Sequence, residues 1–389
     1  MQPFHPAIAL NAQLVRLNAG YRSAGIARYI FNLLCALSAL VPEYELHAFT
    51  GDRQASEALK PIQVHLTRWP THSPIARIAW EQVLWPLELM RRRFALVHSL
   101  AFVSPLMNFD PSIVTVYDLS FILYPDYFRP FNRLYLKWGT QLSVARARRV
   151  IVISESTRRD LVRFLNVPPD KIDVIVPGVE PEFFGNGDPN SLQTFRRSKG
   201  LPEHFLLYVG TLEPRKNIPA LIHAFMRARA RRQLPHQLVI AGGRGWKDET
   251  ITRALEEGGD AIIRPGFVPQ DELPYWYQAA DAFIYPSQYE GFGMPPLEAL
   301  AAGTPVITSN LSALPEAVGD AALLVDPHDE NAIEEAITRM LTDQDLRADL
   351  AMRGVARAKE LTWARAAQAT GAVYRRVLGN RDTIKTGAN

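Results

Sequence analysis

Two glutamates separated by seven residues, Glu290 and Glu298, lie in a stretch that combines glycines with a short helical pattern. A carboxylate can accept two hydrogen bonds from neighbouring hydroxyls, as on a ribose or a hexose. The glycines allow the backbone to approach a ligand closely, and free N–H groups at a helix start attract phosphate. Two carboxylates beside one phosphate site indicate a nucleotide sugar. The alternative is an ordinary turn whose glutamates cap a helix and face water.

The residues around the two glutamates predict a strand, a loop, a helix and a second strand. Residues 282–286 are a short apolar run that is typical of a strand. Pro295 and Pro296 suit a first helical turn, where a missing N–H costs little. We expect Glu298 in that same turn. Gly303 is expected to end the helix.

In this setting Glu290 and Glu298 resemble the E-x7-E motif of the retaining glycosyltransferases of family 4, which have the GT-B fold. The resemblance covers most of the chain and is most specific over residues 205–330. It implies that Glu290 contacts the donor hexose and that Glu298 contacts the nucleotide ribose. It also places a run of loop residues against the donor sugar and phosphate: Gly291, Phe292, Gly293 and Met294.

A basic pair, Arg215 and Lys216, follows the apolar strand 205–210 in a strand-to-helix loop. The pair resembles the basic pair that stabilises the leaving nucleotide in this family. Sugar transfer expels a nucleoside diphosphate, and fixed positive charge on that group lowers the barrier. The alternative for the pair is a structural ion pair with Glu213. We also count Gly210, at the end of the strand, among the donor-binding residues.

The resemblance further implies that the backbone around Gly266, Phe267 and Val268 lines the pocket for the base. Backbone contacts do not reveal which base is bound. Residues 285–326 and 117–121 look most like bacterial mannosyltransferases of surface-polysaccharide assembly, which favours GDP-mannose as the donor. UDP-glucose, UDP-N-acetylglucosamine and deoxysugar nucleotides such as dTDP-sugars remain alternatives.

Two predicted strands of the N-terminal half carry polar residues near their carboxyl ends, where doubly wound sheets bind ligands. They are His98, in strand 96–99, and Tyr117 with Asp118. Many relatives have a histidine that meets the donor hexose at the place of Tyr117, so no histidine is carried over. With a reference pKa of about 10, a tyrosine is a poor base at neutral pH.

We expect Tyr117 and His98 on the acceptor side or in the cleft, and we group Asp118 with the catalytic residues Arg215, Lys216 and Glu290. The alternatives are that Asp118 caps the following segment and that His98 is structural.

The loop 18–25 resembles a family loop that usually holds a glycine pair. Here Ala24 and Gly25 stand in its place. We expect Gly25 and Arg28, early in the following helix, to face the cleft. A solvated surface arginine is the alternative for Arg28.

Charge is unevenly distributed along the chain. Residues 1–150 contain 16 Lys+Arg against 9 Asp+Glu, or +7, and the remainder contains 27 against 31, or −4. The basic N-terminal part favours an anionic partner, either a membrane surface or a pyrophosphate-linked acceptor. No motif supports nucleic acid. Residues 74–93 form an apolar helical pattern that ends in arginines and lies either on a membrane surface or, as we favour, against the N-terminal sheet.

The chain has no apolar run of membrane-spanning length, and its first residues lack a signal-peptide pattern. The single cysteine, Cys35, fits a reducing cytosol and is expected in the core. We therefore expect a cytoplasmic enzyme at the inner face of the cytoplasmic membrane. No His, Cys or Asp cluster has the spacing of metal ligands, so no metal cofactor is expected.

Strands and helices alternate through both halves, which predicts two doubly wound α/β domains. By the resemblance these are the Rossmann-like domains of a GT-B fold that face a central cleft. We place the acceptor-binding domain at 1–185, a linker at about 181–192 and the nucleotide-sugar-binding domain at 193–362. The segment 363–389, which is amphipathic over 363–378 and polar after that, is expected to return as a helix to the first domain.

These features together indicate a retaining, metal-independent hexosyltransferase. It would move mannose from GDP-mannose onto a saccharide or polyprenyl-linked acceptor in polysaccharide or lipopolysaccharide biosynthesis. Two other classes stay open: a GT-B nucleotide-sugar epimerase that needs no acceptor, and a non-catalytic sugar-nucleotide-binding partner. Donor consumption without an acceptor would identify the epimerase.

Overall fold

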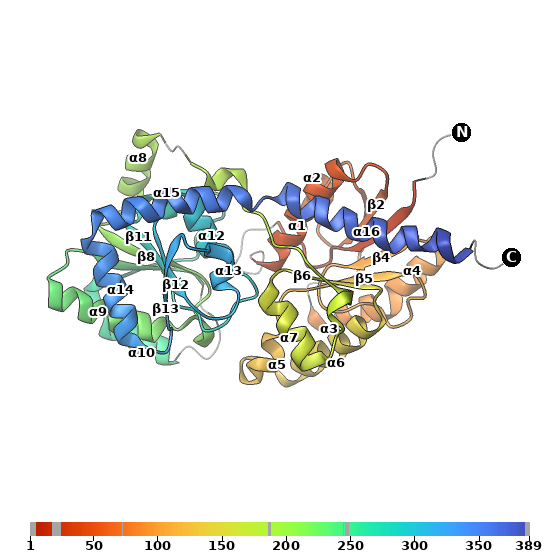
Figure 1. Cartoon of the computed structure of the whole chain (residues 1–389), viewed down its shortest axis with the longest axis horizontal. Coiled ribbons are helices and arrows are strands. Elements are labelled where there is room, and N and C mark those ends of the chain that lie inside the picture. The colour runs from red at the N-terminus through yellow and green to blue at the C-terminus, as the bar shows by residue number, and fades with distance from the viewer. Residues whose placement is uncertain are drawn as a thin grey trace. The chain divides into compact units, whose positions relative to one another are not determined.

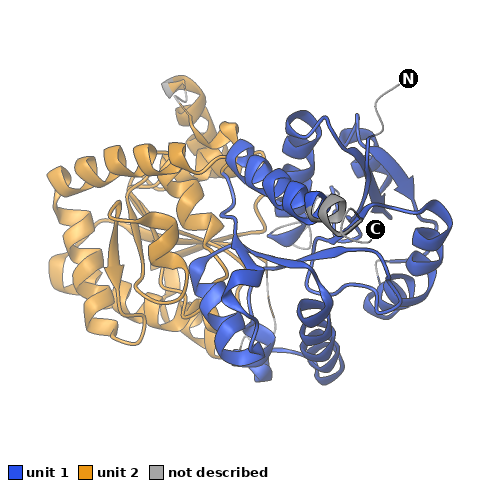
Figure 2. Cartoon of the chain, turned by 45° about the vertical axis from the view of Figure 1, so that its right-hand side comes forward, with its two compact units in different colours: residues 1–18, 22–178, 363–389 blue, residues 19–21, 179–362 orange. Residues whose placement is uncertain are grey.

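The computed structural model describes residues 5–17, 25–71, 73–185, 188–243, 245 and 249–385. The chain forms two compact units (Figure 2). The first contains residues 1–18, 22–178 and 363–389, and the second contains residues 19–21 and 179–362. Each unit is built on one parallel sheet with helices, as the alternating pattern predicted (Figure 1).

The described part of the first unit holds a seven-stranded sheet of order β3-β2-β1-β4-β5-β6-β7, with every pair parallel. Its strands are β1 (Ala7–Asn11), β2 (Glu45–Thr50), β3 (Gln63–Leu66), β4 (Leu96–Ser99), β5 (Ser112–Val116), β6 (Arg149–Val152) and β7 (Ile172–Val174). The strand order reverses direction between β1 and β4, so the topological switch point of this sheet lies there.

Helices cover both faces of this sheet, and the strands are accordingly buried apolar runs. They are α1 (Ile26–Leu40), α2 (Arg53–Ala58), α3 (Pro74–Ala79), a π-helical turn η2 (Trp80–Leu84), α4 (Trp85–Arg92), α5 (Ser120–Leu123), η3 (Pro125–Tyr127), α6 (Pro130–Arg146), α7 (Glu155–Leu165), η4 (Pro169–Lys171) and α16 (Trp363–Lys385). Cys35 lies on the exposed face of α1, so its expected place in the core is wrong.

The predicted helix over residues 74–93 is present as α3, η2 and α4. Trp80 and Trp85 are buried and stack on one another at 5.5 Å between ring centroids, beside Phe49 of β2. This segment is therefore packed on the sheet through one face, which is the alternative that we favoured.

The last helix, α16, belongs to the first unit. Trp363 packs edge-to-face on Tyr29 at 5.3 Å, and the Tyr374 hydroxyl lies 2.8 Å from Nδ1 of His98. Arg375 pairs with Glu43 at 2.6 Å. The predicted return of the C-terminal helix to the N-terminal sheet is confirmed.

The described part of the second unit holds a six-stranded parallel sheet of order β10-β9-β8-β11-β12-β13. Its strands are β8 (Phe205–Val209), β9 (Gln237–Ala241), β10 (Ile262–Gly266), β11 (Ala282–Tyr285), β12 (Val306–Ser309) and β13 (Ala322–Val325). The chain runs outward from β8 to β10 and then resumes on the other side at β11. The switch point of this sheet therefore lies between β8 and β11.

Helices alternate with these strands along the chain, as in doubly wound folds. They are η5 (Pro181–Phe183), α8 (Pro189–Lys199), η6 (Pro214–Lys216), α9 (Ile218–Arg232), α10 (Glu249–Glu257), η7 (Gly259–Ala261), α11 (Leu273–Ala279), α12 (Met294–Ala301), α13 (Leu314–Val318), α14 (Glu330–Thr342) and α15 (Gln344–Glu360). Within the described residues no helix is both long and apolar enough to cross a membrane.

Candidate active site

The switch point of the second sheet gathers the charged residues that the sequence singled out. Arg215 and Lys216 lie in η6, directly after β8, and Glu290 lies in the loop after β11. Because β8 and β11 are neighbouring parallel strands, their carboxyl ends meet at one edge of the sheet. This edge is where an open α/β sheet binds its ligand.

The carboxylate of Glu290 is shared by both cations. Its Oε1 atom lies 3.0 Å from Nη1 of Arg215 and also accepts a hydrogen bond from Nζ of Lys216. Arg215 uses its Nε for Glu213, at 2.7 Å from Oε1, so the structural ion pair that we weighed as an alternative is present as well. Lys216 is only 6% exposed and Glu213 only 4%.

The charges hold this cluster in its ionised form. Burial by itself would raise the pKa of Glu290, but the nearby Arg215 and Lys216 cations and the hydrogen bonds from Lys216 and Ser287 lower that pKa to about 2. Burial, reinforced by Arg215, lowers the pKa of the Lys216 ammonium from its usual value. Glu290 is therefore a fixed anion at neutral pH, and neither a proton donor nor a strong base.

Donor atoms remain available next to this anion. The hydrogen bonds to the Glu290 carboxylate all go to Oε1, including those from Tyr285 Oη at 3.0 Å and Ser287 Oγ at 2.8 Å, and Oε2 accepts no hydrogen bond from the described residues. The backbone N–H groups of Gly291, Phe292 and Gly293 likewise donate to no other described residue, although all three residues are buried. An unpaired carboxylate oxygen and unpaired amides suit a ligand that carries both hydroxyls and an anion.

The loop that holds these amides is fixed at its two ends. The Ser312 hydroxyl accepts a hydrogen bond from the Glu290 N–H at 2.9 Å. Gly293 has a φ of 116° as the N-cap residue of α12, and a Cβ there would lie 2.7 Å from Cδ2 of Leu314. The positive φ favours glycine at this position, and any Cβ would also force the Leu314 side chain to shift. Met294 begins the helix.

Glu298 is the fifth residue of α12 and begins its second turn, so its predicted place in the first turn is wrong. Its side chain does not cap the helix. The residue is 2% exposed, and its Oε2 accepts a hydrogen bond from the Tyr277 hydroxyl of α11 at 2.9 Å. The contact with a ribose that the resemblance implies stays a prediction.

The remaining predicted donor residues lie at the same carboxyl edge. Gly210 follows β8 and Gly242 follows β9. The two backbones approach so closely that a Cβ on Gly242 would lie 1.9 Å from the Gly210 carbonyl oxygen. The Gly242 N–H donates to the carbonyl of Gly266, at the end of β10, at 2.7 Å. Phe267 is 43% exposed and Val268 is buried. Their roles in binding a base stay predictions.

Several residues of this site escaped the sequence reasoning. Tyr285 ends β11, and its hydroxyl contacts both Lys216 and Glu290. Its place as the last residue of a predicted strand was a signal for the carboxyl edge. Tyr208 stacks on Tyr285 at 5.6 Å, and its buried hydroxyl has no hydrogen-bond partner among the described residues. Nothing in the sequence distinguished Tyr208 from a core residue.

In the first unit, the predicted site residues form hydrogen bonds within the protein, and His98 is the clearest case. His98 is fully buried on β4, with Nδ1 2.8 Å from the Tyr374 hydroxyl and Nε2 2.8 Å from Oγ1 of Thr115. Burial lowers its pKa to about 3, so the ring is neutral. The structure therefore contradicts an acceptor contact and gives His98 the structural role.

Tyr117 is also occupied within its own unit. It is 3% exposed, and its hydroxyl donates to the Leu100 carbonyl at 2.6 Å. Its ring packs edge-to-face on Tyr29 at 5.1 Å, and burial raises its pKa well above the usual value. Tyr117 has no hydroxyl proton to offer a sugar, so its place among the cleft residues is wrong.

Asp118 takes the capping role that we left open. Its Oδ1 accepts hydrogen bonds from the N–H of Ser120 at 2.8 Å and from its hydroxyl at 2.6 Å. Asp118 is half-buried, and its hydrogen bonds from the described residues both go to Oδ1 and leave Oδ2 open. A catalytic contact through Oδ2 stays a prediction.

Gly25 and Arg28 lie at the start of α1. Gly25 is its N-cap residue with a φ of 63°, and Arg28 is half-buried in the first turn. The loop residues 18–24, including Ala24, lie outside the described residues.

Two buried polar side chains at the switch point of the first sheet were not predicted. Gln13 follows β1 and is 2% exposed, and neither its Nε2 nor its Oε1 has a hydrogen-bond partner among the residues that the structure describes. Ser99 ends β4, and its buried Oγ is also without a partner within the described ranges. Buried polar atoms without partners are uncommon in folded proteins, so these two are better candidates for acceptor contacts than His98 and Tyr117.

One group of residues that spacing along the chain did not reveal has the composition of a metal site. His204, His236 and Asp281 lie together although the chain separates them widely. The distance between His204 Nδ1 and Asp281 Oδ2 is 3.3 Å, and that between His236 Nε2 and Asp281 Oδ2 is 3.7 Å. Asp281 also accepts from the N–H of Phe205 at 2.8 Å. The group lies at the amino edge of the sheet, opposite the cluster around Glu290.

Two doubly wound parallel sheets, with a basic pair, a carboxylate and open glycine amides at the switch point of the second, define a GT-B glycosyltransferase. The family model described as Glycosyltransferase Family 4 matches residues 23–183, and the model described as Glycosyl transferases group 1 matches residues 192–357. The chain belongs to this family of glycosyltransferases, as the motif around Glu290 and Glu298 indicated.

Known relatives agree with this assignment. The chain is 35% identical over 257 residues to O-antigen chain mannosyltransferase B of Escherichia coli, which covers 65% of this chain and 67% of that protein. It is 30% identical over 247 residues to the serotype-specific mannosyltransferase WbdA of Escherichia coli, which covers 62% of this chain but only 30% of that longer protein. Sucrose-phosphate synthase from Thermosynechococcus elongatus has the same fold, with a TM-score of 0.76 at 24% identity over 96% of this chain and 100% of that one.

Proposed function

We propose that this glycosyltransferase is a retaining mannosyltransferase that uses GDP-mannose. Its acceptor would be a saccharide or a polyprenyl-linked saccharide in the synthesis of an O-antigen or a similar surface polysaccharide. Relatives named as mannosyltransferases support the sugar, and the relative named as an O-antigen chain mannosyltransferase supports the process. The donor nucleotide, the stereochemical outcome and the acceptor are parts of the proposal.

The cluster around Glu290 supports a role for each residue. Arg215 and Lys216 would hold the diphosphate, and the N–H groups of Gly291–Gly293 would donate to its oxygens and to the hexose. Oε2 of Glu290 would accept a hydrogen bond from a hexose hydroxyl, because Oε1 is already shared by the two cations. Glu298 would accept from the ribose hydroxyls.

The electrostatics favour a front-face displacement. The low pKa of Glu290 and its four donors make its carboxylate a weak base and a weak nucleophile, so it serves better as a binding group. In the proposed step the acceptor hydroxyl attacks the anomeric carbon on the face from which the diphosphate leaves. The departing phosphate oxygen takes the hydroxyl proton, and Arg215 and Lys216 stabilise the developing negative charge. These two cations would make a metal cofactor unnecessary.

The excess of positive charge in residues 1–150 supports an acceptor that is itself anionic or lies on an anionic surface. A polyprenyl diphosphate carrier at the inner face of the cytoplasmic membrane has both properties. We therefore propose a cytoplasmic enzyme that meets the membrane peripherally through its first unit.

The single observation that carries the proposal is the open Oε2 of Glu290 beside three unpaired backbone amides. Thermal unfolding with GDP, UDP, ADP and dTDP, each in the presence of a chelator, tests it. A nucleotide at 100 times its dissociation constant should stabilise the protein by about 2.7 kcal/mol. A shift with GDP is the expected result. A shift only with UDP or dTDP would overturn the donor, and no shift with any nucleotide would contradict the site.

A further inference from the structure

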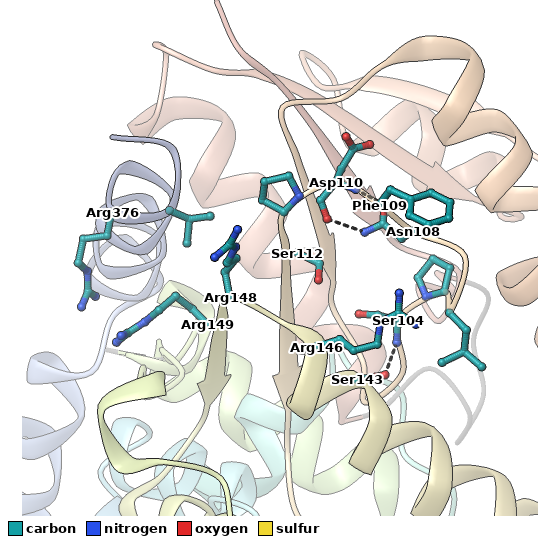
Figure 3. A pocket seen from close by; sticks show the side chains of 14 residues that line it. Ser104, Asn108, Phe109, Asp110, Ser112, Ser143, Arg146, Arg148, Arg149 and Arg376 are labelled. Atoms are coloured by element: carbon teal, nitrogen blue, oxygen red, sulfur yellow. Dashed lines mark hydrogen bonds between the residues drawn. The ribbon is translucent and has the colours of Figure 1, made fainter. Parts of the chain in front are cut away.

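A pocket of about 790 Å³ lies at the amino edge of the first sheet, where β5 and β6 begin (Figure 3). It is opposite the edge that carries Tyr117 and Asp118. Four arginines from three parts of the chain line it, namely Arg146 of α6, Arg148 and Arg149 at the start of β6, and Arg376 of α16. Asp110 is the acidic residue of the lining.

The arginines are only partly neutralised. Nε of Arg149 and Nη2 of Arg376 each lie 2.7 Å from a single carboxylate, that of Asp173. The guanidinium groups of Arg146 and Arg148 are exposed and have no hydrogen-bond or ion-pair partner in the part of the chain that the structure describes. The pocket therefore presents two uncompensated cations, which favours an anion such as a phosphate group.

An exposed apolar surface adjoins this arginine pocket. On α6, four large side chains follow one another at helical spacing on one face: Phe131, Leu134, Trp138 and Leu142, which are 57%, 58%, 54% and 41% exposed. We call these four residues the apolar stripe. An ordinary surface helix carries polar residues on such a face. The next turn of the same helix supplies Ser143 and Arg146 to the pocket.

The loop between β4 and β5 extends the apolar surface on the other side of the pocket. Leu106 and Phe109 both line the pocket, and they are 41% and 81% exposed. The loop is held in place on α6, because the Ser104 N–H donates to the Ser143 hydroxyl at 2.7 Å. Phe109 is therefore an exposed apolar group in the lining of the arginine pocket.

We propose that the arginine pocket, the apolar stripe and Phe109 form a docking surface for an anionic phospholipid bilayer. The lipid phosphate would occupy the pocket, while Trp138 and Phe109 would enter the headgroup region. This inference rests on the proposed function, because a lipid-linked acceptor requires the enzyme to work at a membrane. It goes further by naming the surface that meets the lipid.

The charges favour a bilayer over a second copy of the chain. Arg133 and Lys137 are exposed on α6 beside the apolar stripe, and Arg146 and Arg148 lie at its other end. A two-fold contact through the stripe would bring these cations against themselves. An anionic lipid surface attracts them, and a helix that combines Trp, Phe and Leu with Lys and Arg suits the interface.

The test is a sedimentation assay of the full chain with vesicles. One set contains phosphatidylcholine alone, and in the other about 30% of the lipid is phosphatidylglycerol. The wild type should bind the anionic vesicles and bind the neutral ones much more weakly. Salt should weaken the binding. A wild type that stays in solution with anionic vesicles would overturn the proposal.

Variants of exposed residues locate the contact. Arg146→Ala and Arg148→Ala should each lower the partition coefficient about fivefold, and Trp138→Asp should lower it about tenfold or more. Arg232→Ala and Met352→Asp are the matched controls, because both residues are exposed in the second unit. Equal losses in the controls, or none in the three test variants, would place the contact elsewhere and overturn the proposal.

Two further measurements separate the remaining outcomes. A wild-type dimer in solution that Trp138→Asp dissociates would assign the stripe to a second copy and overturn the bilayer. Trp138→Asp should keep its turnover with a water-soluble saccharide acceptor, because the stripe lies outside the candidate active site. If the wild type turns over no sugar nucleotide, the proposed function fails, while the vesicle results still decide the docking surface.

Discussion

The carboxyl edges of the two sheets share a topology but use their polar residues in opposite ways. At the edge of the second sheet, Arg215, Lys216 and Glu290 hold one another while Oε2 of Glu290 and the loop amides stay open. At the edge of the first sheet, His98 is hydrogen-bonded to Tyr374 and Thr115. The Tyr117 hydroxyl donates to the Leu100 carbonyl.

The difference shows what separates a site from a polar core. A binding site has donors and acceptors that no protein group uses. The ionised groups that hold these atoms in place keep their charge at neutral pH. A polar core satisfies each atom within the protein and stays neutral, as the lowered pKa of His98 illustrates. By this criterion the candidate active site lies in the second unit. In the first unit, Gln13 and Ser99 have buried polar atoms without a partner among the described residues.

The largest effect should come from removing either cation. Arg215→Ala and Lys216→Ala should each lower kcat by about a hundredfold or more, because the charge on the leaving diphosphate loses its partner. Steady-state release of the nucleotide measures this. Arg227→Ala is the control, because Arg227 of α9 is ion-paired with Glu330 and Glu334 away from the cluster. Near-normal turnover in both test variants would remove the diphosphate contact.

Acid should weaken the two units in different pH ranges. The pKa of His98 falls from 6.5 in the unfolded chain to about 3 in the fold, so its contribution is complete above pH 6.5 and is lost as the pH falls toward 3. The pKa of Glu290 falls from 4.5 to about 2, so its contribution is lost only below pH 4.5.

Scanning calorimetry across this range measures the effect, with His98→Asn and Glu290→Gln as the variants. The free energy of unfolding of each variant should be lower than that of the wild type by on the order of a few kcal/mol. It should also vary less with pH over the range in which the replaced group titrates. An unchanged slope in His98→Asn between pH 6.5 and 3 would contradict the neutral, buried histidine.

A smaller effect should separate structure from chemistry in the first unit. Tyr117→Phe should keep kcat within about threefold and should lower the free energy of unfolding by about 1 kcal/mol, because it removes one internal hydrogen bond. Turnover and urea unfolding measure the two quantities. A large loss of kcat with unchanged stability would mean that the Tyr117 hydroxyl contacts a substrate, and it would contradict the structural role.

The smallest effect concerns the unpaired hydroxyl of Tyr208. Tyr208→Phe should leave the free protein as stable as the wild type or slightly more stable, by about 0.5 kcal/mol, because the hydroxyl has no partner to lose. Thermal unfolding without ligand measures this. Destabilisation by more than about 1 kcal/mol would mean that the hydroxyl is bonded in the free protein.

Sequence patterns predicted the fold and the second unit's cluster because they are local. Alternating apolar strands and helices define doubly wound sheets. A basic pair, or a glutamate followed by a glycine, that comes directly after a strand must lie at the carboxyl edge of the sheet. The first unit's residues depended on contacts across the chain. The partner of His98, Tyr374, comes from the last helix, and no local pattern reveals such a hydrogen bond.

The same limit applies to exposure and to distant clusters. The apolar stripe of α6 has a helical period, which by itself is equally typical of a core face. His204, His236 and Asp281 meet only because β8, β9 and β11 are neighbours in the sheet. Strand order, and not spacing along the chain, brings those residues together.

The central claim is that Arg215 and Lys216 hold the diphosphate of the donor. Calorimetric titration of GDP and GMP into the wild type and into Lys216→Ala tests it directly, with Arg227→Ala as the control. We predict that the wild type binds GDP about tenfold or more tightly than GMP. Lys216→Ala should lose most of that preference while its affinity for GMP changes little. The same GDP-to-GMP ratio in both proteins would contradict the claim.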